Sequence, residues 1–362
     1  MSLWRDVRDF FARERVWGVF FLVIFGIYAG IYFWQGKMVQ QERPSEAVES
    51  LRQAEARLKT ELRSSGGLRN LLEERPGLLV AFNIFTFLLL AGVTLGLVID
   101  FIWIFSPRSR QRFLPSHGPP EASSWSIKTI FKIVLLFLAV TLSLSLLLAF
   151  IRSLLFPESS PNLLILIHTT LADFLCIGLV IYFVQHRGGQ WQDLGFKGGP
   201  VGREIRLGLT AYLAILPLFL FVLILLVVGA QLFNYEPPPH ALVEVFLEEE
   251  ARAPGLIAYS IFLACIAGPI FEEIFFRGFC YPAFKKRWGA GRALVLSAAF
   301  FGLIHQNIFA FVPIFVLGMI LGYLYEKTGS LVPSIVLHIV HNSVFIGYFF
   351  LAKEVLESAG MS

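Results

Sequence analysis

Charged side chains are scarce in this chain of 362 residues. Lys, Arg, Asp and Glu together make up 15% of it, whereas a soluble globular domain carries roughly 25%. Hydrophobic residues make up 56%, which is more apolar surface than a single soluble core of this size can bury. The composition therefore excludes an ordinary soluble enzyme, a disordered chain and a coiled coil. It predicts a protein that crosses a membrane several times.

The sequence also lacks the signatures of several common sites. Its three cysteines, Cys176, Cys265 and Cys280, lie in apolar stretches and form no CxxC pair, which excludes a disulfide framework and a cysteine zinc site. Neither GxSxG nor HExxH occurs, so the patterns typical of serine hydrolases and zinc peptidases are missing. Basic residues are interleaved with acidic ones, and we expect no nucleic-acid partner.

Long apolar runs dominate what is present. A helix needs about 20 apolar residues to cross a hydrocarbon layer of roughly 30 Å. We therefore expect an all-α, polytopic transmembrane helix bundle of about nine spans, with the functional core in the last four. A break between Asn307 and Pro313 is either a tight turn or a kink in one bent helix. The expected spans are 16–34, 79–105, 129–151, 163–184, 207–230, 255–279, 292–309, 311–325 and 331–351.

The spans and loops suggest three regions. Residues 1–128 form a two-span region whose loop at 36–77 has the pattern of a charged, amphipathic helix. We interpret that loop as a helical hairpin on the membrane surface or as a segment that binds a partner or substrate. Residues 129–253 form a connecting region of three spans. Residues 254–352 form the core that carries most of the polar residues within spans.

Loop charge predicts the orientation of the chain in the membrane. The segments 106–128, 185–206 and 280–292 are rich in Lys and Arg, whereas 231–253 is acidic. Because basic loops stay on the cytoplasmic side, we expect a multi-pass protein of the cell membrane with its N-terminus in the cytoplasm.

Ionisable and amide side chains gather in three of the last spans. Such groups are costly at membrane depth and usually face a functional cavity. Glu273 and Arg277 are four residues apart and so share one helix face, which predicts a structural ion pair. Glu272 points about 100° away and is left as a free carboxylate that suits a general base. The full set is Glu272, Glu273, Arg277, His305, His338, His341 and Asn342.

The depth of these groups suggests a single site. If the sixth span continues helically to a turn near Gly289, Glu272 and His305 differ in height by only about 5 Å. A carboxylate and an imidazole at one level can deprotonate a water. His338 and Asn342, four residues apart and facing them, can donate hydrogen bonds to an oxyanion. The pattern predicts attack of water on an amide bond.

Three motifs at these residues resemble a known family. EExxxR is met by Glu272–Arg277, FxxxH by Phe301–His305 and HxxxN by His338–Asn342. Together and in this order they are similar to the CAAX protease and bacteriocin-processing family, also called type II CAAX prenyl endopeptidases or the Abi family. The resemblance covers roughly a quarter of the chain, from about residue 255 to 350.

The resemblance implies an intramembrane endopeptidase of the glutamate type that needs no cofactor. In that family the residues matching Glu272 and His305 activate water, and those matching His338 and Asn342 form the oxyanion hole. Glu273 and Arg277 would support the site. The implied substrate is a membrane-associated protein or peptide, either a prenylated Cys-a-a-X protein or a leader or bacteriocin peptide. Membrane lipid is the other implied partner.

Other interpretations of the same residues stay open. Glu272, His305 and His338 could supply three ligands to a catalytic zinc ion, or the polar groups could merely lock the bundle. The chain could also be a non-catalytic scaffold or a bacteriocin self-immunity protein that retains the motifs. A transporter would show internal repeats, and the sequence has none. His168 and Asp173 are interpreted as isolated polar groups without a role in the site.

Overall fold

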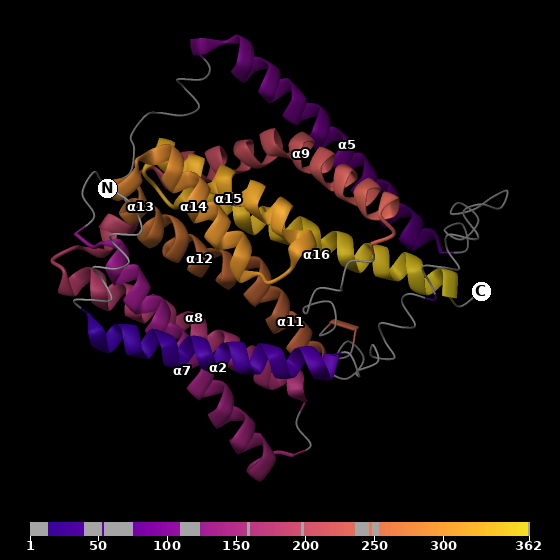
Figure 1. Cartoon of the computed structure of the whole chain (residues 1–362). Helices are drawn as coiled ribbons and strands as arrows, with labels where there is room; N and C mark the ends of the chain where they lie inside the picture. Colours follow the sequence, from indigo (N-terminus) through magenta and orange to yellow (C-terminus); the bar gives the residue numbers. More distant parts are fainter. Residues whose placement is uncertain are drawn as a thin grey trace.

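The computed structural model describes residues 14–39, 75–108, 124–157, 160–196, 199–235, 246–247 and 253–360, together with Gln53. Within these ranges all regular structure is helical (Figure 1). The expected all-α helix bundle is therefore confirmed.

Each of the nine expected spans coincides with a helical segment. Seven segments are long and apolar enough to cross a membrane, while α14 and the Arg15–Ile31 part of α2 are shorter apolar helices. The segments are α2 (Arg15–Val39), α5 (Pro76–Phe105), α7 (Ile127–Leu155), α8 (Pro161–His186), α9 (Val201–Leu232), the composite helix Pro254–Trp288, α14 (Ala290–Ile304), α15 (Ile308–Thr328) and α16 (Val332–Gly360).

The composite helix alternates between two helical forms. It runs through α11 (Pro254–Phe262), the π-helical η2 (Leu263–Ala267), α12 (Gly268–Glu273), the π-helical η3 (Ile274–Cys280) and α13 (Tyr281–Trp288). The sixth span thus continues to the turn at Gly289, where φ is +80°, as the depth argument requires. Single π turns inside α-helices are often found at functional sites.

A tight turn, not a kink, separates α14 from α15. Gln306 adopts a positive φ of 51°, and the Asn307 side chain accepts hydrogen bonds from the backbone N–H groups of Phe309 and Ala310, both at 3.0 Å. This side-chain cap starts α15. The turn leaves His305 directly after the last residue of α14.

The C-terminal helices form the centre of the molecule. Figure 1 shows the orange and yellow helices α11 to α16 with α9 and α5 on one side and α7, α8 and α2 on the other. α14 packs against α15, and α16 packs against α9. The side chains of Phe276 and Phe301 are buried where these helices meet. Glu273, Arg277 and His338 are therefore enclosed by apolar packing.

Some expectations remain predictions. Most of the loop at 36–77 lies outside the described residues, and so does most of the acidic segment at 231–253. The division of the chain at residues 128 and 253 and the cytoplasmic N-terminus also stay predictions.

Candidate active site

A buried ion pair stands at the centre of the candidate site. Arg277 Nη1 donates to Glu273 Oε1 at 2.8 Å, and neither side chain is exposed. Arg277 Nη2 also donates to the carbonyl oxygen of Gly318 on α15 at 3.2 Å. The guanidinium lies over the Phe301 ring, 4.5 Å from its centroid. The pair predicted from helical spacing is thus present, and it joins the composite helix to α14 and α15.

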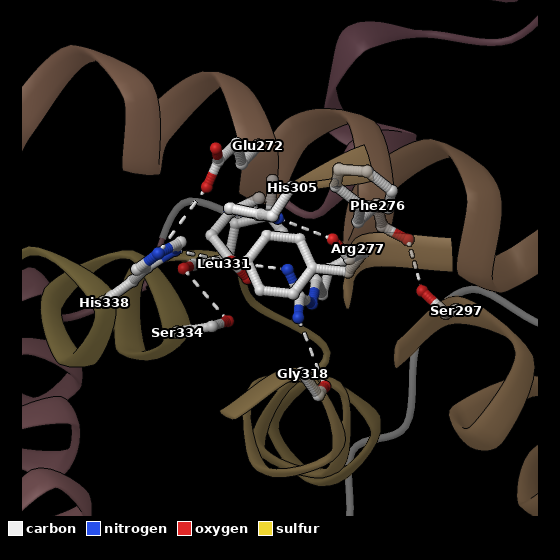
Figure 2. A network of polar contacts seen from close by, with 11 residues as sticks. Glu272, Phe276, Arg277, Ser297, His305, Gly318, Leu331, Ser334 and His338 are labelled. Atoms are coloured by element: carbon white, nitrogen blue, oxygen red, sulfur yellow. Dashed lines mark hydrogen bonds and ion pairs between the residues drawn. The ribbon is translucent and has the colours of Figure 1, made fainter. Parts of the chain in front are cut away.

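His338 of α16 reaches both glutamates. Its Nδ1 lies 3.1 Å from Glu273 Oε1, and its Nε2 lies 3.5 Å from Glu272 Oε2 (Figure 2). The Glu272 side chain is 29% exposed, whereas His338 is only 3% exposed. Glu272 is therefore the accessible carboxylate of the two. The sequence placed His338 across the site from Glu272, but the structure places it beside Glu272, where its other ring nitrogen contacts the buried Glu273.

His305 has a fixed orientation at the end of α14. Its Nδ1 lies 2.8 Å from the carbonyl oxygen of Phe301. Since a carbonyl oxygen only accepts hydrogen bonds, Nδ1 carries the proton and Nε2 of a neutral ring is left with a free lone pair. The Phe301 ring packs edge-on against His305 and His338, with centroids 5.0 and 5.7 Å apart. A chain of contacts thus links Glu272 to His305 through His338 and Phe301.

Asn342 is anchored to the composite helix. Its Nδ2 donates to the carbonyl oxygen of Ala264 in η2 at 2.8 Å. A side-chain amide has two N–H donors, so one donor remains for another acceptor. His341, the neighbouring residue, turns away from the site and packs against Phe219 and Phe345, with ring centroids 4.6 and 4.9 Å away. The placement of His341 beside the HxxxN face, but off it, agrees with the helical spacing.

His168 is not the isolated group that the sequence suggested. Its Nε2 lies 3.0 Å from Ser145 Oγ and 3.0 Å from the carbonyl oxygen of Thr141. The carbonyl contact requires a proton on Nε2. That nitrogen therefore cannot act as a base toward Ser145, and the cluster joins α7 to α8 without resembling a catalytic dyad.

Asp173 was also interpreted as isolated, yet its helix α8 packs against α12, which carries Glu272. Asp173 interacts electrostatically with Glu272, and the next residue, Phe174, packs edge-on against Phe271 with centroids 5.2 Å apart. The signal that could have revealed it is spacing, because Asp173 lies on a stripe of α8 with steps of three and four residues. The stripe comprises Leu166, Thr170, Asp173, Ile177, Val180 and Val184.

The fit of a metal ion can be judged from the donor groups. No group of three or more His, Cys, Asp or Glu side chains in the described ranges is arranged so that it could hold a metal ion. The expectation of a site without a metal, and the alternative of zinc bound by Glu272, His305 and His338, both stay predictions. The chemistry proposed below uses protein groups alone.

Comparison with known proteins gives one match. The model of the family described as Type II CAAX prenyl endopeptidase Rce1-like matches residues 254–344, which contain all three motifs. No curated protein and no solved structure matches the chain. The resemblance found in the motifs is therefore confirmed for this segment. At the level of the family, the match supports a CAAX-type intramembrane protease that acts on a peptide or protein substrate in the membrane.

Proposed function

We propose that this protein is an intramembrane endopeptidase in which Glu272 and His305 activate a water molecule for attack on a peptide bond. The observation that carries the proposal is the convergence of the three motifs. Glu272, His338, Phe301 and His305 form one chain of contacts inside the segment that matches the family model.

Two acceptor groups are available for the water. The Glu272 carboxylate is partly exposed, and His305 presents Nε2 as an acceptor because Nδ1 is bound to Phe301. A water that donates one hydrogen to each is oriented with its lone pair toward a substrate carbonyl. As the oxygen–carbon bond forms, one of the two groups takes the proton as general base. The same proton is then returned to the leaving amine when the carbon–nitrogen bond breaks.

The oxyanion that forms needs hydrogen-bond donors. We assign this role to the second N–H of Asn342 and to His338. The Nδ1 of His338 is bound to Glu273, so its Nε2, which lies 3.5 Å from Glu272 Oε2, is the nitrogen left to donate to the oxyanion. The buried pair of Glu273 and Arg277 holds that imidazole in place. Preorganised donors of this kind contribute more in a dry, low-dielectric site than in water.

The substrate class follows from the family match. A peptide or protein embedded in or bound to the membrane is the substrate at the family level. Either a prenylated Cys-a-a-X segment or a leader-type peptide is compatible with the proposed chemistry, since both present an amide bond to an activated water. The N-terminal region, which the family model does not match, favours the leader or bacteriocin type.

Comparative peptidomics of membranes that contain the wild type or the Glu272→Gln variant tests the proposal. We expect peptides that appear with the wild type and vanish with Glu272→Gln and His305→Ala. His341→Ala is the matched control, because His341 lies on the same helix as His338 but outside the site, and it should preserve the peptides. Farnesylated and unprenylated Cys-a-a-X reporter peptides distinguish the two substrate types. Unchanged peptide profiles in both site variants would favour a non-catalytic scaffold or self-immunity protein.

A further inference from the structure

The group that accepts a hydrogen bond from Asn342 is a backbone carbonyl inside a transmembrane helix. Such a carbonyl normally accepts from a backbone N–H of the same helix. In an α-helix the carbonyl of residue i accepts from the N–H of residue i+4. Ala264 O would therefore accept from Gly268, yet the Gly268 N–H donates to Leu263 O, five residues back. The π turn of η2 thus removes the ordinary partner of Ala264 O.

The next candidate donor does not exist. In π-helical bonding the carbonyl of residue i accepts from residue i+5, which for Ala264 is Pro269. Proline has no backbone N–H. Ala264 O is consequently left without a backbone donor by the combination of a π turn and a proline two residues beyond its end. An unpaired carbonyl at this depth is costly, and the Asn342 amide occupies it at 2.8 Å.

Glycine is required beside that proline. A Cβ added to Gly268 would lie 2.9 Å from Leu263 O, the acceptor of the Gly268 N–H. A methyl group there would push the carbonyl away and disturb the π turn. Gly268 therefore permits the π turn, and Pro269 leaves the carbonyl of Ala264, the second residue of that turn, without a backbone donor.

We propose that Gly268 and Pro269 are positioning residues that create the bare carbonyl by which Asn342 is held in the site. This inference rests on the proposed function in one respect only, namely that Asn342 donates its second N–H to the oxyanion. Neither residue needs to touch the substrate. Their effect passes through the Ala264 carbonyl to the orientation of the Asn342 amide.

The chain contains a matched control for this arrangement. The second π segment, η3, is likewise followed by one residue and then a proline, here Tyr281 and Pro282. The Tyr281 N–H donates to Phe276 O, five residues back. The carbonyl five residues before Pro282 is that of Arg277, whereas Asn342 is bound to Ala264. Pro282→Ala therefore restores a backbone N–H in the same local context without competing with Asn342.

The first measurement needs no substrate. In protein labelled with 15N at its asparagine amides, the Asn342 resonance is identified by its loss in Asn342→Ala. In Pro269→Ala the new N–H competes for Ala264 O, so we expect that resonance to move toward the position of a free amide. Gly268→Ala should have the same effect by moving Leu263 O, and Pro282→Ala should leave the resonance in place. An unmoved Asn342 resonance in folded Pro269→Ala and Gly268→Ala would overturn the proposal.

The second measurement is the cleavage rate of a reporter peptide that the wild type cleaves. Loss of one oxyanion donor lowers kcat by about 10²–10³-fold, and a displaced donor should cost about 10-fold or more with KM unchanged. Pro269→Ala should add no further loss in an Asn342→Ala background, because the two changes remove the same contact. Additive losses would overturn the inference. If the amide resonance moves but no reporter is cleaved, the anchoring is supported while the proposed peptidase activity fails.

Discussion

His305 and Phe301 are joined by a hydrogen bond of 2.8 Å from the imidazole Nδ1 to the backbone carbonyl oxygen one turn earlier. The bond comes from the last turn of α14, where the helix ends and its carbonyls lose their usual partners. One interaction therefore both caps the helix and selects the tautomer of the ring. The nitrogen left with a lone pair is the one that catalysis by a general base requires.

Because of this bond, the structural role of His305 Nδ1 can be tested separately from the proposed catalytic role of Nε2. In His305→Asn the amide can still donate to the Phe301 carbonyl, but the acceptor at the position of Nε2 is lost. We expect cleavage of a reporter peptide to fall by about 10²–10⁴-fold, the usual contribution of a general base. Thermal unfolding should stay closer to the wild type than in His305→Ala. A rate near that of the wild type in His305→Asn would show that Nε2 has no part in the reaction.

The buried ion pair should dominate stability around the site. Removing one partner of such a pair typically costs about 3–5 kcal/mol, because the remaining charge is buried without compensation. We expect a loss of this size for Arg277→Met, measured by unfolding of the purified protein in detergent. The double variant Glu273→Gln with Arg277→Met should recover part of it. Lys132→Met, which breaks a partly exposed pair with Glu14, should cost only about 0–1 kcal/mol.

A close approach of two helices makes Gly96 sensitive to substitution. An added Cβ would overlap Leu213 O on α9 and lie 2.9 Å from Pro217 Cδ. Gly96→Ala should force α5 away from α9, and overpacking of this kind costs about 1–3 kcal/mol. Gly77, on the same helix, has no atom within 4 Å of an added Cβ. Equal unfolding temperatures for Gly96→Ala and Gly77→Ala would contradict the packing described for these helices.

The orientation in the membrane can be measured with single cysteines. If the basic segment 280–292, which includes the last turn of α13, is cytoplasmic, a thiol introduced by Arg287→Cys should react with an impermeant reagent only after the cells are permeabilised. Tyr235→Cys, in the exposed end that follows α9, should react in intact cells. Cys265 and Cys280 are buried and should contribute little background. Labelling of Arg287→Cys in intact cells would reverse the predicted topology.

The sequence allowed the spans and one pair of the site to be predicted, because both depend on short-range relations. Apolar runs of sufficient length become helices, and residues four apart, such as Glu273 and Arg277, share a helix face. The depth estimate for Glu272 and His305 also rested on one assumption, an uninterrupted helix up to Gly289, which the structure confirms.

Other parts of the site depend on relations that residue types do not reveal. The partner of Asn342 is a backbone carbonyl, and every residue has one, so nothing in the side-chain pattern singles out Ala264. The position of His338 beside Glu272 depends on how α16 is rotated against the composite helix. Asp173 lies on a different helix, about a hundred residues earlier in the sequence, and its approach to Glu272 depends on how α8 packs against that helix.

The π turn of η2 also has a geometric consequence for everything that follows it. Compared with a plain α-helix, it contains one extra residue, and each residue corresponds to a rotation of about 100° around the helix axis. If a residue between 263 and 267 were deleted, Glu272 would turn by that angle relative to Tyr259, which is bonded to Thr170 of α8. The carboxylate would then point away from His338, although every motif residue would still be present. The direction in which the EExxxR side chains point from the helix axis is thus determined by the π turn several residues before the motif.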